Sequence, residues 1–272
     1  MADKPRTIWL GAVAYDSKAV TIWEAIKEYF VESKVQFDFV LFSSYEAQVE
    51  ALFDRKIDIA WNTPVAYVRC ENRLGGTSRT LAMRDTDVGF TSKFITRRDS
   101  GIRSLADLKG KRFALGSRDS AQAAILPFHH LSNSNVVPHR DVEIVRFDTD
   151  LGKHGDTGTS ELEVLKAVQT GVADAGAVGH AIYIQIMSGA LTSLGEFRAF
   201  YTSPPFSHCN FTALPEIDPQ LAAIWTKTLL AMDYNNPKHK KAMDLEGLKR
   251  WVPCNKEGYS DLTEAMKNQG ML

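Results

Sequence analysis

The stretch ALGSRDSAQAAILPFHHL, residues 114–131, joins a short apolar strand to a helix. Ala121, Ile125 and Phe128 recur at the spacing of one helical face, so the helix is expected to begin near residue 121. A glycine, two serines and an arginine fill the junction. It is either a simple turn or a cradle for an anion, because the first N–H groups of a helix lack partners and carry partial positive charge.

Strands and helices alternate on both sides of this junction. Apolar strand patterns lie at 6–15, 35–42, 56–61, 111–116, 142–147 and 173–178. Helical periodicity follows most of them, which predicts an α/β fold with mixed sheets flanked by helices. Extended segments near 90–97 and 196–205 separate the second run of strands from the rest of the chain.

A chain that leaves one lobe, builds a second and returns makes two lobes joined by a two-stranded hinge. The predicted lobes are 1–94 together with 204–272, and 95–203. Ligands of open α/β sheets bind where the strands end at their carboxyl sides. We therefore expect the ligand in the cleft between the lobes, which the hinge closes.

Composition excludes several classes of protein. The 272 residues carry 32 basic and 33 acidic side chains, so no net field attracts nucleic acid. No apolar run approaches the roughly 20 residues that span a bilayer. The N-terminus has no pattern of a secretory signal, so the chain is either cytoplasmic or the mature form of an exported protein. The cysteines Cys70, Cys209 and Cys254 form no metal-ligand pattern.

Catalytic motifs are also missing from the sequence. It contains no G-x-S-x-G, no H-E-x-x-H, no P-loop and no dinucleotide G-x-G-x-x-G. Paired carboxylates at Asp85 and Asp87, and at Asp148 and Asp150, lie in expected loops without an acid–base partner. The sequence therefore predicts no enzyme, no cofactor and no metal.

Three segments carry a resemblance to a known family: KIDIAWNTPVAYV at 56–68, SKFITRRDSGIRSLADLKGKRFALGSRDSAQAAILPFHHL at 92–131, and VLKAVQTGVADAGAV at 164–178. They resemble the solute-binding proteins of phosphonate and phosphite ABC transporters, over roughly residues 6–215. The resemblance implies the type II periplasmic-binding fold, a periplasmic location, a monomer, and an ABC transporter permease as partner. It implies no nucleic acid partner.

The ligand loop departs from the family's pattern. Phosphonate binders carry a Ser-Thr-Ser-Gly-like run whose hydroxyls and amides hold the phosphonate oxygens. Here the matching run reads Ser-Arg-Asp-Ser-Ala-Gln at 117–122, so hydroxyls remain at Ser117 and Ser120 and a carboxylate has entered. The expected ligand is a small anionic or zwitterionic organic molecule that is phosphonate-like, with other anions left open.

The candidate ligand-binding residues follow expected strand ends, start the helix of the opening stretch, or match the family. They are Tyr15, Tyr45, Asn62, Thr63, Ser117, Arg118, Ser120, Ala121, Gln122, His154, Asp174 and His208. Each has a structural alternative. The tyrosines are equally suited to packing, Asn62 and Thr63 to a turn, and Ser120 to a helix cap. Arg118 and His154 suit the surface, and Asp174 suits a strand-end hydrogen bond.

Three functions remain open on this basis. The main hypothesis is a transporter's solute-binding protein that captures its ligand by hinge closure. The alternatives are an enzyme of small-metabolite biosynthesis on the same two-lobed scaffold, and a ligand-sensing module coupled to a partner protein.

Overall fold

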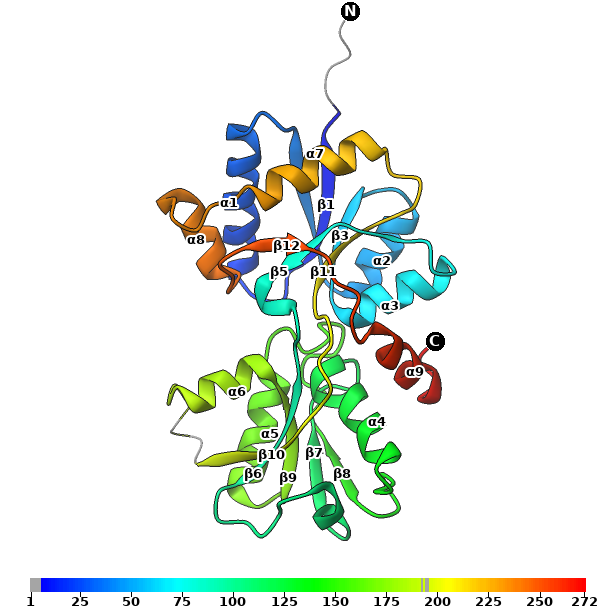
Figure 1. The fold of residues 1–272 in the computed structure, drawn as a ribbon, viewed down its shortest axis with the longest axis vertical. Helices are drawn as coiled ribbons and strands as arrows, with labels where there is room; N and C mark the ends of the chain where they lie inside the picture. Colours follow the sequence, from blue (N-terminus) through cyan, green and yellow to red (C-terminus); the bar gives the residue numbers. More distant parts are fainter. Residues whose placement is uncertain (1–5, 192, 194–195) are drawn as a thin grey trace, which may run out of the picture. The chain divides into compact units, whose positions relative to one another are not determined.

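The computed structural model describes residues 6–191, 193 and 196–272 and divides into two compact units. Unit 1 comprises Met1–Gly89 and Ser207–Lys256, and unit 2 comprises Phe90–Phe206 and Glu257–Leu272 (Figure 1). The chain passes between the units three times, not twice as expected. The third passage exists because the C-terminal helix α9 (Tyr259–Asn268) packs on unit 2, whereas the predicted first lobe included this helix.

Unit 1 is built on a five-stranded sheet with the order β2-β1-β3-β11-β4. The strands are β1 (Ile8–Val13), β2 (Phe37–Phe42), β3 (Ile59–Asn62), β4 (Arg79–Thr80) and β11 (Asn210–Ala213). β1 pairs in parallel with β2 and β3, and β11 is antiparallel to β3. The helices are α1 (Lys18–Glu32), α2 (Tyr45–Phe53), α3 (Pro64–Arg73), α7 (Pro219–Leu230) and α8 (Pro237–Leu245). A small second sheet pairs β5 (Ala82–Arg84) with β12 (Trp251–Pro253).

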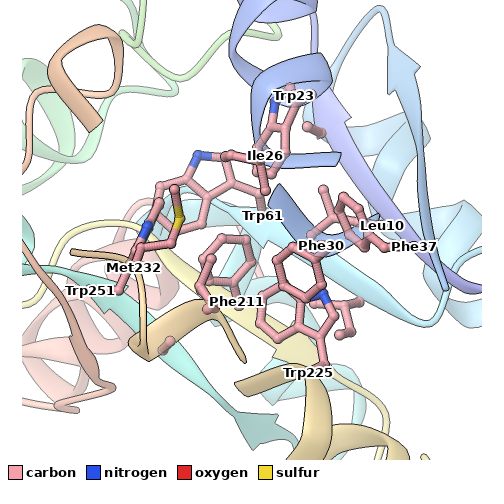
Figure 2. Packing of buried hydrophobic residues seen from close by; sticks show 14 of the residues in the cluster. Leu10, Trp23, Ile26, Phe30, Phe37, Trp61, Phe211, Trp225, Met232 and Trp251 are labelled. Carbon is pink, nitrogen blue, oxygen red and sulfur yellow. The ribbon is translucent and has the colours of Figure 1, made fainter. Parts of the chain in front are cut away.

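Aromatic side chains fill the larger core of unit 1 (Figure 2). The rings of Trp61 and Phe211 lie 4.4 Å apart, and Trp225 and Trp251 meet Phe211 at 4.8 and 5.4 Å. Burying each such ring contributes roughly 2–3 kcal/mol. A smaller cluster around Tyr45 packs α2 and α3 on the other face of the sheet.

Two polar residues at helix starts in unit 1 act as caps. The Ser44 hydroxyl accepts the N–H of Ala47, and the Thr63 hydroxyl accepts the N–H of Ala66. Pro64 follows at the first helical position, where its missing N–H costs nothing. These caps start α2 and α3 directly after β2 and β3, so the polar ends of the strands lie along one edge of the sheet.

Unit 2 is built on a second five-stranded sheet with the order β10-β6-β9-β7-β8. The strands are β6 (Ser92–Arg97), β7 (Arg112–Leu115), β8 (Glu143–Arg146), β9 (Ala175–Gly179) and β10 (Phe197–Thr202). β7 is parallel to β8 and β9, while β6 is antiparallel to β9 and β10. The helices are a π-helical turn η3 (Ala121–Ile125), α4 (Leu126–Asn133), α5 (Thr159–Thr170) and α6 (His180–Met187), with α9. Short 3₁₀ turns lie at Asp85–Asp87 in unit 1 and Leu105–Leu108 in unit 2.

Alternating side chains of the unit 2 strands enter two separate cores. Phe113 and Leu115 pack on the face that carries Leu131 of α4, while Ala114 faces Val164 and Leu165 of α5. The period of two along the strand places helices on both faces.

Where the chain enters and leaves unit 2, Phe90 and Phe206 exchange two backbone hydrogen bonds of 2.8 Å. No helix of the described residues is long and apolar enough to cross a membrane.

Candidate functional site

The stretch at 114–131 forms the carboxyl end of β7 and the helix start that follows it. The N–H of Ser120 donates to the Ser117 carbonyl at 2.8 Å, which closes a tight turn. The Ser120 hydroxyl oxygen then accepts the N–H of Ala123 at 3.2 Å and caps the helix. The helix begins at Ala121 as the periodicity predicts, although its first turn is π-helical. The N–H groups of the first turn have no acceptor within the helix itself.

Two buried hydroxyls of this turn have donors without acceptors. The side chains of Ser117 and Ser120 are both fully buried. Among the residues that the structure describes, the Ser117 hydroxyl has no hydrogen-bond partner, and Ser120 uses only its oxygen, as the cap. Ser160, at the start of α5, has a third buried hydroxyl without a partner in the same described set. Since buried polar groups are nearly always paired, this turn is chemically incomplete as it stands.

The loop at 150–158 packs directly on the helix start. The N–H of Gly152 donates to the Asp119 carboxylate at 2.6 Å. A Cβ added to Gly155 would lie 2.5 Å from the Ser120 hydroxyl and 3.0 Å from Gln122 Nε2, and Gly155 has a φ of +83°. Only glycine fits that position, because it combines a left-handed backbone with this close approach. His154, which the sequence also allowed on the surface, is buried beside Gly155.

A buried carboxylate beneath the helix start was not predicted. Glu161, in the first turn of α5, accepts the N–H of Gly179 at 2.6 Å and the Gln122 side-chain amide at 3.2 Å. Burial raises the pKa of Glu161 to about 7, aided by the nearby carboxylates of Asp150 and Asp156, and the two hydrogen bonds offset only part of this rise. The sequence signal was an acidic residue in a first helical turn, which ordinarily lies at the surface.

The structure does not bring two of the predicted site residues to this helix start. Asp174 precedes β9 and accepts the N–H of Arg112 at 2.8 Å, so it lies at the amino ends of β7 and β9, opposite the Ser117 turn. Its role there is the strand-end hydrogen bond that the sequence left open. Arg118 pairs with Asp148 through its backbone and guanidinium, and its side chain is 65% exposed. That guanidinium is therefore committed to a surface ion pair.

In unit 1 the remaining candidates lie along the carboxyl ends of the parallel strands. Tyr15 follows β1, Tyr45 begins α2 after β2, and Thr63 caps α3 after β3. Asn62 has a structural commitment, because its amide oxygen accepts from the buried Gln48 at 2.8 Å. Its amide nitrogen contacts the Cys70 sulfur at 3.7 Å.

His208 lies at the same end of the unit 1 sheet, two residues before β11. Its Nδ1 is 3.3 Å from Asp87 Oδ1 and 3.1 Å from the Cys209 sulfur. These three side chains offer metal-ligand atoms within 4.8 Å of one another. Arg84 nevertheless binds both oxygens of Asp87, at 2.7 and 2.8 Å. Burial raises the pKa of Asp87, but the Arg84 and His208 partners outweigh it and hold it at about 2. The guanidinium thus occupies both oxygens of the carboxylate that a cation would need.

Comparison with known proteins gives one family. Residues 11–259 match the family described as the periplasmic substrate-binding protein of phosphonate ABC transporters. The probable ABC transporter phosphite-binding protein PhnD1 of Prochlorococcus marinus is 23% identical over 248 residues, which cover 88% of this chain and 80% of that protein.

Solved structures share the fold over nearly the whole chain. PhnD1 of Prochlorococcus marinus in complex with methylphosphonate has a TM-score of 0.74 at 19% identity, covering 99% of this chain and 100% of that one. The periplasmic aliphatic sulphonate-binding protein SsuA of Escherichia coli has a TM-score of 0.65 at 15% identity, covering 99% and 89%. The two-lobed type II periplasmic-binding fold expected from the sequence is thereby confirmed. The chain belongs to the family of periplasmic substrate-binding proteins of phosphonate ABC transporters.

Proposed function

We propose that unit 2 binds one tetrahedral anionic group of a small organic ligand at the start of η3. The observation that carries this proposal is the pair of buried hydroxyl donors at Ser117 and Ser120, which have no acceptor among the described residues. An anion's oxygens supply those acceptors. The N–H groups of Ala121 and Gln122 begin the helix and add donors with partial positive charge at the same point.

The donors at this turn are neutral and buried. A hydrogen bond from such a donor to a charged acceptor is worth about 1.5–3 kcal/mol, roughly twice a hydrogen bond between two neutral groups. Arg118 is turned to Asp148, so we assign it no ligand contact. We therefore propose Ser117, Ser120, Ala121 and Gln122 as the anion contacts. We also propose His154, which lies in the 150–158 loop packed on this turn.

The ligand class follows from family membership and from what relatives bind. One relative is described in complex with methylphosphonate and another as binding aliphatic sulphonates. Both ligands combine a tetrahedral anionic group with a small organic substituent. We propose the same class here, because the altered loop keeps both hydroxyls and one oxygen of its new carboxylate, Asp119, is bound to Gly152 within unit 2.

Unit 1 offers further candidate contacts in this proposal. Tyr15, Tyr45 and Thr63 lie at the carboxyl ends of its parallel strands, where α/β sheets bind ligands. His208 precedes the antiparallel strand β11 and lies at the same edge of the sheet. The protein then delivers the ligand to the transporter's permease without changing it chemically.

Calorimetric titration with methylphosphonate, methanesulfonate, phosphite and phosphate tests the proposal. Ser120→Ala is expected to weaken binding of the best anion about 10- to 100-fold, since one charge-assisted hydrogen bond is lost. Ser132→Ala is the matched control, because Ser132 lies exposed on α4 and bonds only to a carbonyl of its own helix. Failure of all four anions to bind the wild-type protein contradicts the proposal. Chemical turnover of a bound anion, followed by mass spectrometry, contradicts the transport role.

A further inference from the structure

Glu161 places a buried carboxylate one side chain away from the proposed anion. Gln122 lies in the first turn of η3, where we place the anion, and its amide nitrogen is 3.2 Å from Glu161 Oε1. The other carboxylate oxygen accepts the N–H of Gly179 at the end of β9. Glu161 thus joins three elements, η3, α5 and β9, directly behind the anion-binding turn.

Among the described residues, no lysine, arginine or histidine forms an ion pair with Glu161, and the two side-chain charges that act on it are Asp150 and Asp156, both acidic. The titratable groups on the elements packed around it are Asp119, Asp150, Lys153, His154, Asp156 and His180. The start of α5 offsets part of the cost of a negative charge. The burial of Glu161 nevertheless brings its pKa to about 7.

A bound anion adds a negative charge that is separated from Glu161 only by the side-chain amide of Gln122. A like charge at this range disfavours the ionised form of a buried carboxyl group. The cost disappears if Glu161 takes up a proton. Protonation also changes what the carboxyl group does, because Oε1 becomes a donor instead of an acceptor.

We propose that binding of the anion is coupled to protonation of Glu161, which reverses the Gln122 amide and sets the charge of ligand that the site accepts. As a carboxylate, Glu161 accepts the Gln122 NH₂ group. As a carboxylic acid, its O–H donates to the Gln122 carbonyl oxygen, and the NH₂ group turns to the anion. This coupling rests on the proposed function, and it states how anion binding at the same site is controlled. Glu161 is a positioning residue in it, acting through Gln122.

Ligand charge selection follows from this coupling. A singly charged anion, such as a sulfonate or a phosphonate that keeps one proton, adds the least negative charge beside Glu161. A doubly charged phosphonate binds with greater proton uptake. The site therefore favours singly charged tetrahedral anions, increasingly so as the pH rises above neutrality.

Methanesulfonate makes the effect measurable, because it stays singly charged throughout the neutral range. For a group with a pKa of about 7, the protonated fraction falls about tenfold between about pH 6 and about pH 8. If only the protonated form binds, wild-type affinity falls by the same factor. Glu161→Gln keeps a neutral donor at this position and is expected to change affinity less than about twofold over that range.

The experiment is calorimetric titration of the full chain with methanesulfonate and with methylphosphonate, at several pH values and in two buffers of different ionisation enthalpy. The second buffer counts the protons taken up. Wild type is expected to take up more protons per bound anion than Glu161→Gln. Glu163→Gln is the control, being the same change two residues along α5, where the carboxylate binds Thr149. It is expected to behave as wild type.

The outcomes separate the two proposals. Binding of either anion with the same proton uptake in wild type and Glu161→Gln overturns the coupling while leaving the proposed function intact. Absence of binding by both anions at every pH overturns the proposed function, and the coupling with it. Proton uptake that disappears equally in Glu163→Gln also contradicts the assignment to Glu161.

Discussion

Replacing Gly155 with alanine tests the packing of the 150–158 loop on the anion-binding turn. The added Cβ would lie 2.5 Å from the Ser120 hydroxyl, 2.9 Å from Ser120 Cβ and 3.0 Å from Gln122 Nε2. Because an added Cβ only 2.9 Å from Ser120 Cβ is too close, the loop or the helix start must move, and Ser120 and Gln122 are both buried. The substitution therefore displaces two proposed anion contacts at once.

Backbone strain and steric displacement can be separated by a matched glycine. Gly110 lies in the same unit with a φ of +72°, and a Cβ there would meet nothing within 4 Å. Alanine at either position pays the left-handed penalty of about 1–2 kcal/mol. Gly155→Ala adds overpacking of about 1–3 kcal/mol, so it is expected to destabilise the protein by about 2–5 kcal/mol.

The assays are urea unfolding of both variants and calorimetric titration with methylphosphonate. Gly155→Ala is expected to lose stability beyond Gly110→Ala and to bind the anion at least about tenfold more weakly, which corresponds to about 1.4 kcal/mol. Gly110→Ala is expected to keep wild-type affinity. Equal stability of the two variants, with unchanged affinity in Gly155→Ala, would refute the assigned packing.

Three further substitutions test the assignments around the site. Asp174→Asn is expected to cost about 1–3 kcal/mol of unfolding free energy with methylphosphonate affinity unchanged, since its carboxylate accepts a backbone N–H at the far end of β7; a large affinity loss without destabilisation would restore it to the site. Arg118→Ala is expected to change the free energy of unfolding by less than about 1 kcal/mol and anion affinity by less than about threefold, because the guanidinium is exposed beside Asp148; a loss of anion binding would contradict the exclusion of Arg118 from the site. Asp87 has its pKa lowered from 3.8 to about 2, so its ionised carboxylate contributes about 2 kcal/mol to the free energy of unfolding. This contribution is complete above pH 3.8 and is lost as the pH falls through 2. Acid unfolding of Asp87→Asn should lack this component, and an unchanged acid profile would contradict it.

Periodicity was sufficient to predict most of the fold. Ser120 was the candidate helix cap at the opening stretch, and it acts as one. The helix after the opening stretch begins at Ala121 as its apolar spacing predicts. These features depend on neighbours within a few residues, which is the range over which a sequence pattern carries structural information.

The placement of α9 depended on contacts that no local pattern carries. Its amphipathic sequence predicts a helix but not the surface that covers its apolar face. In the structure α9 packs against η3 and α4 of unit 2, and Gln269 donates to the Ile125 carbonyl at 3.0 Å. The predicted first lobe, which included 204–272, kept this helix with the preceding helices of unit 1.

The positions of the candidate site residues could be predicted only in part, because some of them depend on contacts between distant segments. Strand ends could be found from apolar runs, which correctly put Ser117 and Ser120 at the carboxyl end of β7. Asp174 precedes β9, so it lies at the opposite edge of the sheet from residues that follow a strand. Glu161 was missed, since only the tertiary packing of α5 against β9 and η3 buries its carboxylate.

A crystal structure of the protein with methylphosphonate tests the central claim most directly. Phosphonate oxygens are expected within about 3 Å of the Ser117 and Ser120 hydroxyls and of the backbone nitrogens of Ala121 and Gln122. A bound phosphonate that contacts none of these four residues, with both hydroxyls still lacking an acceptor, would contradict it.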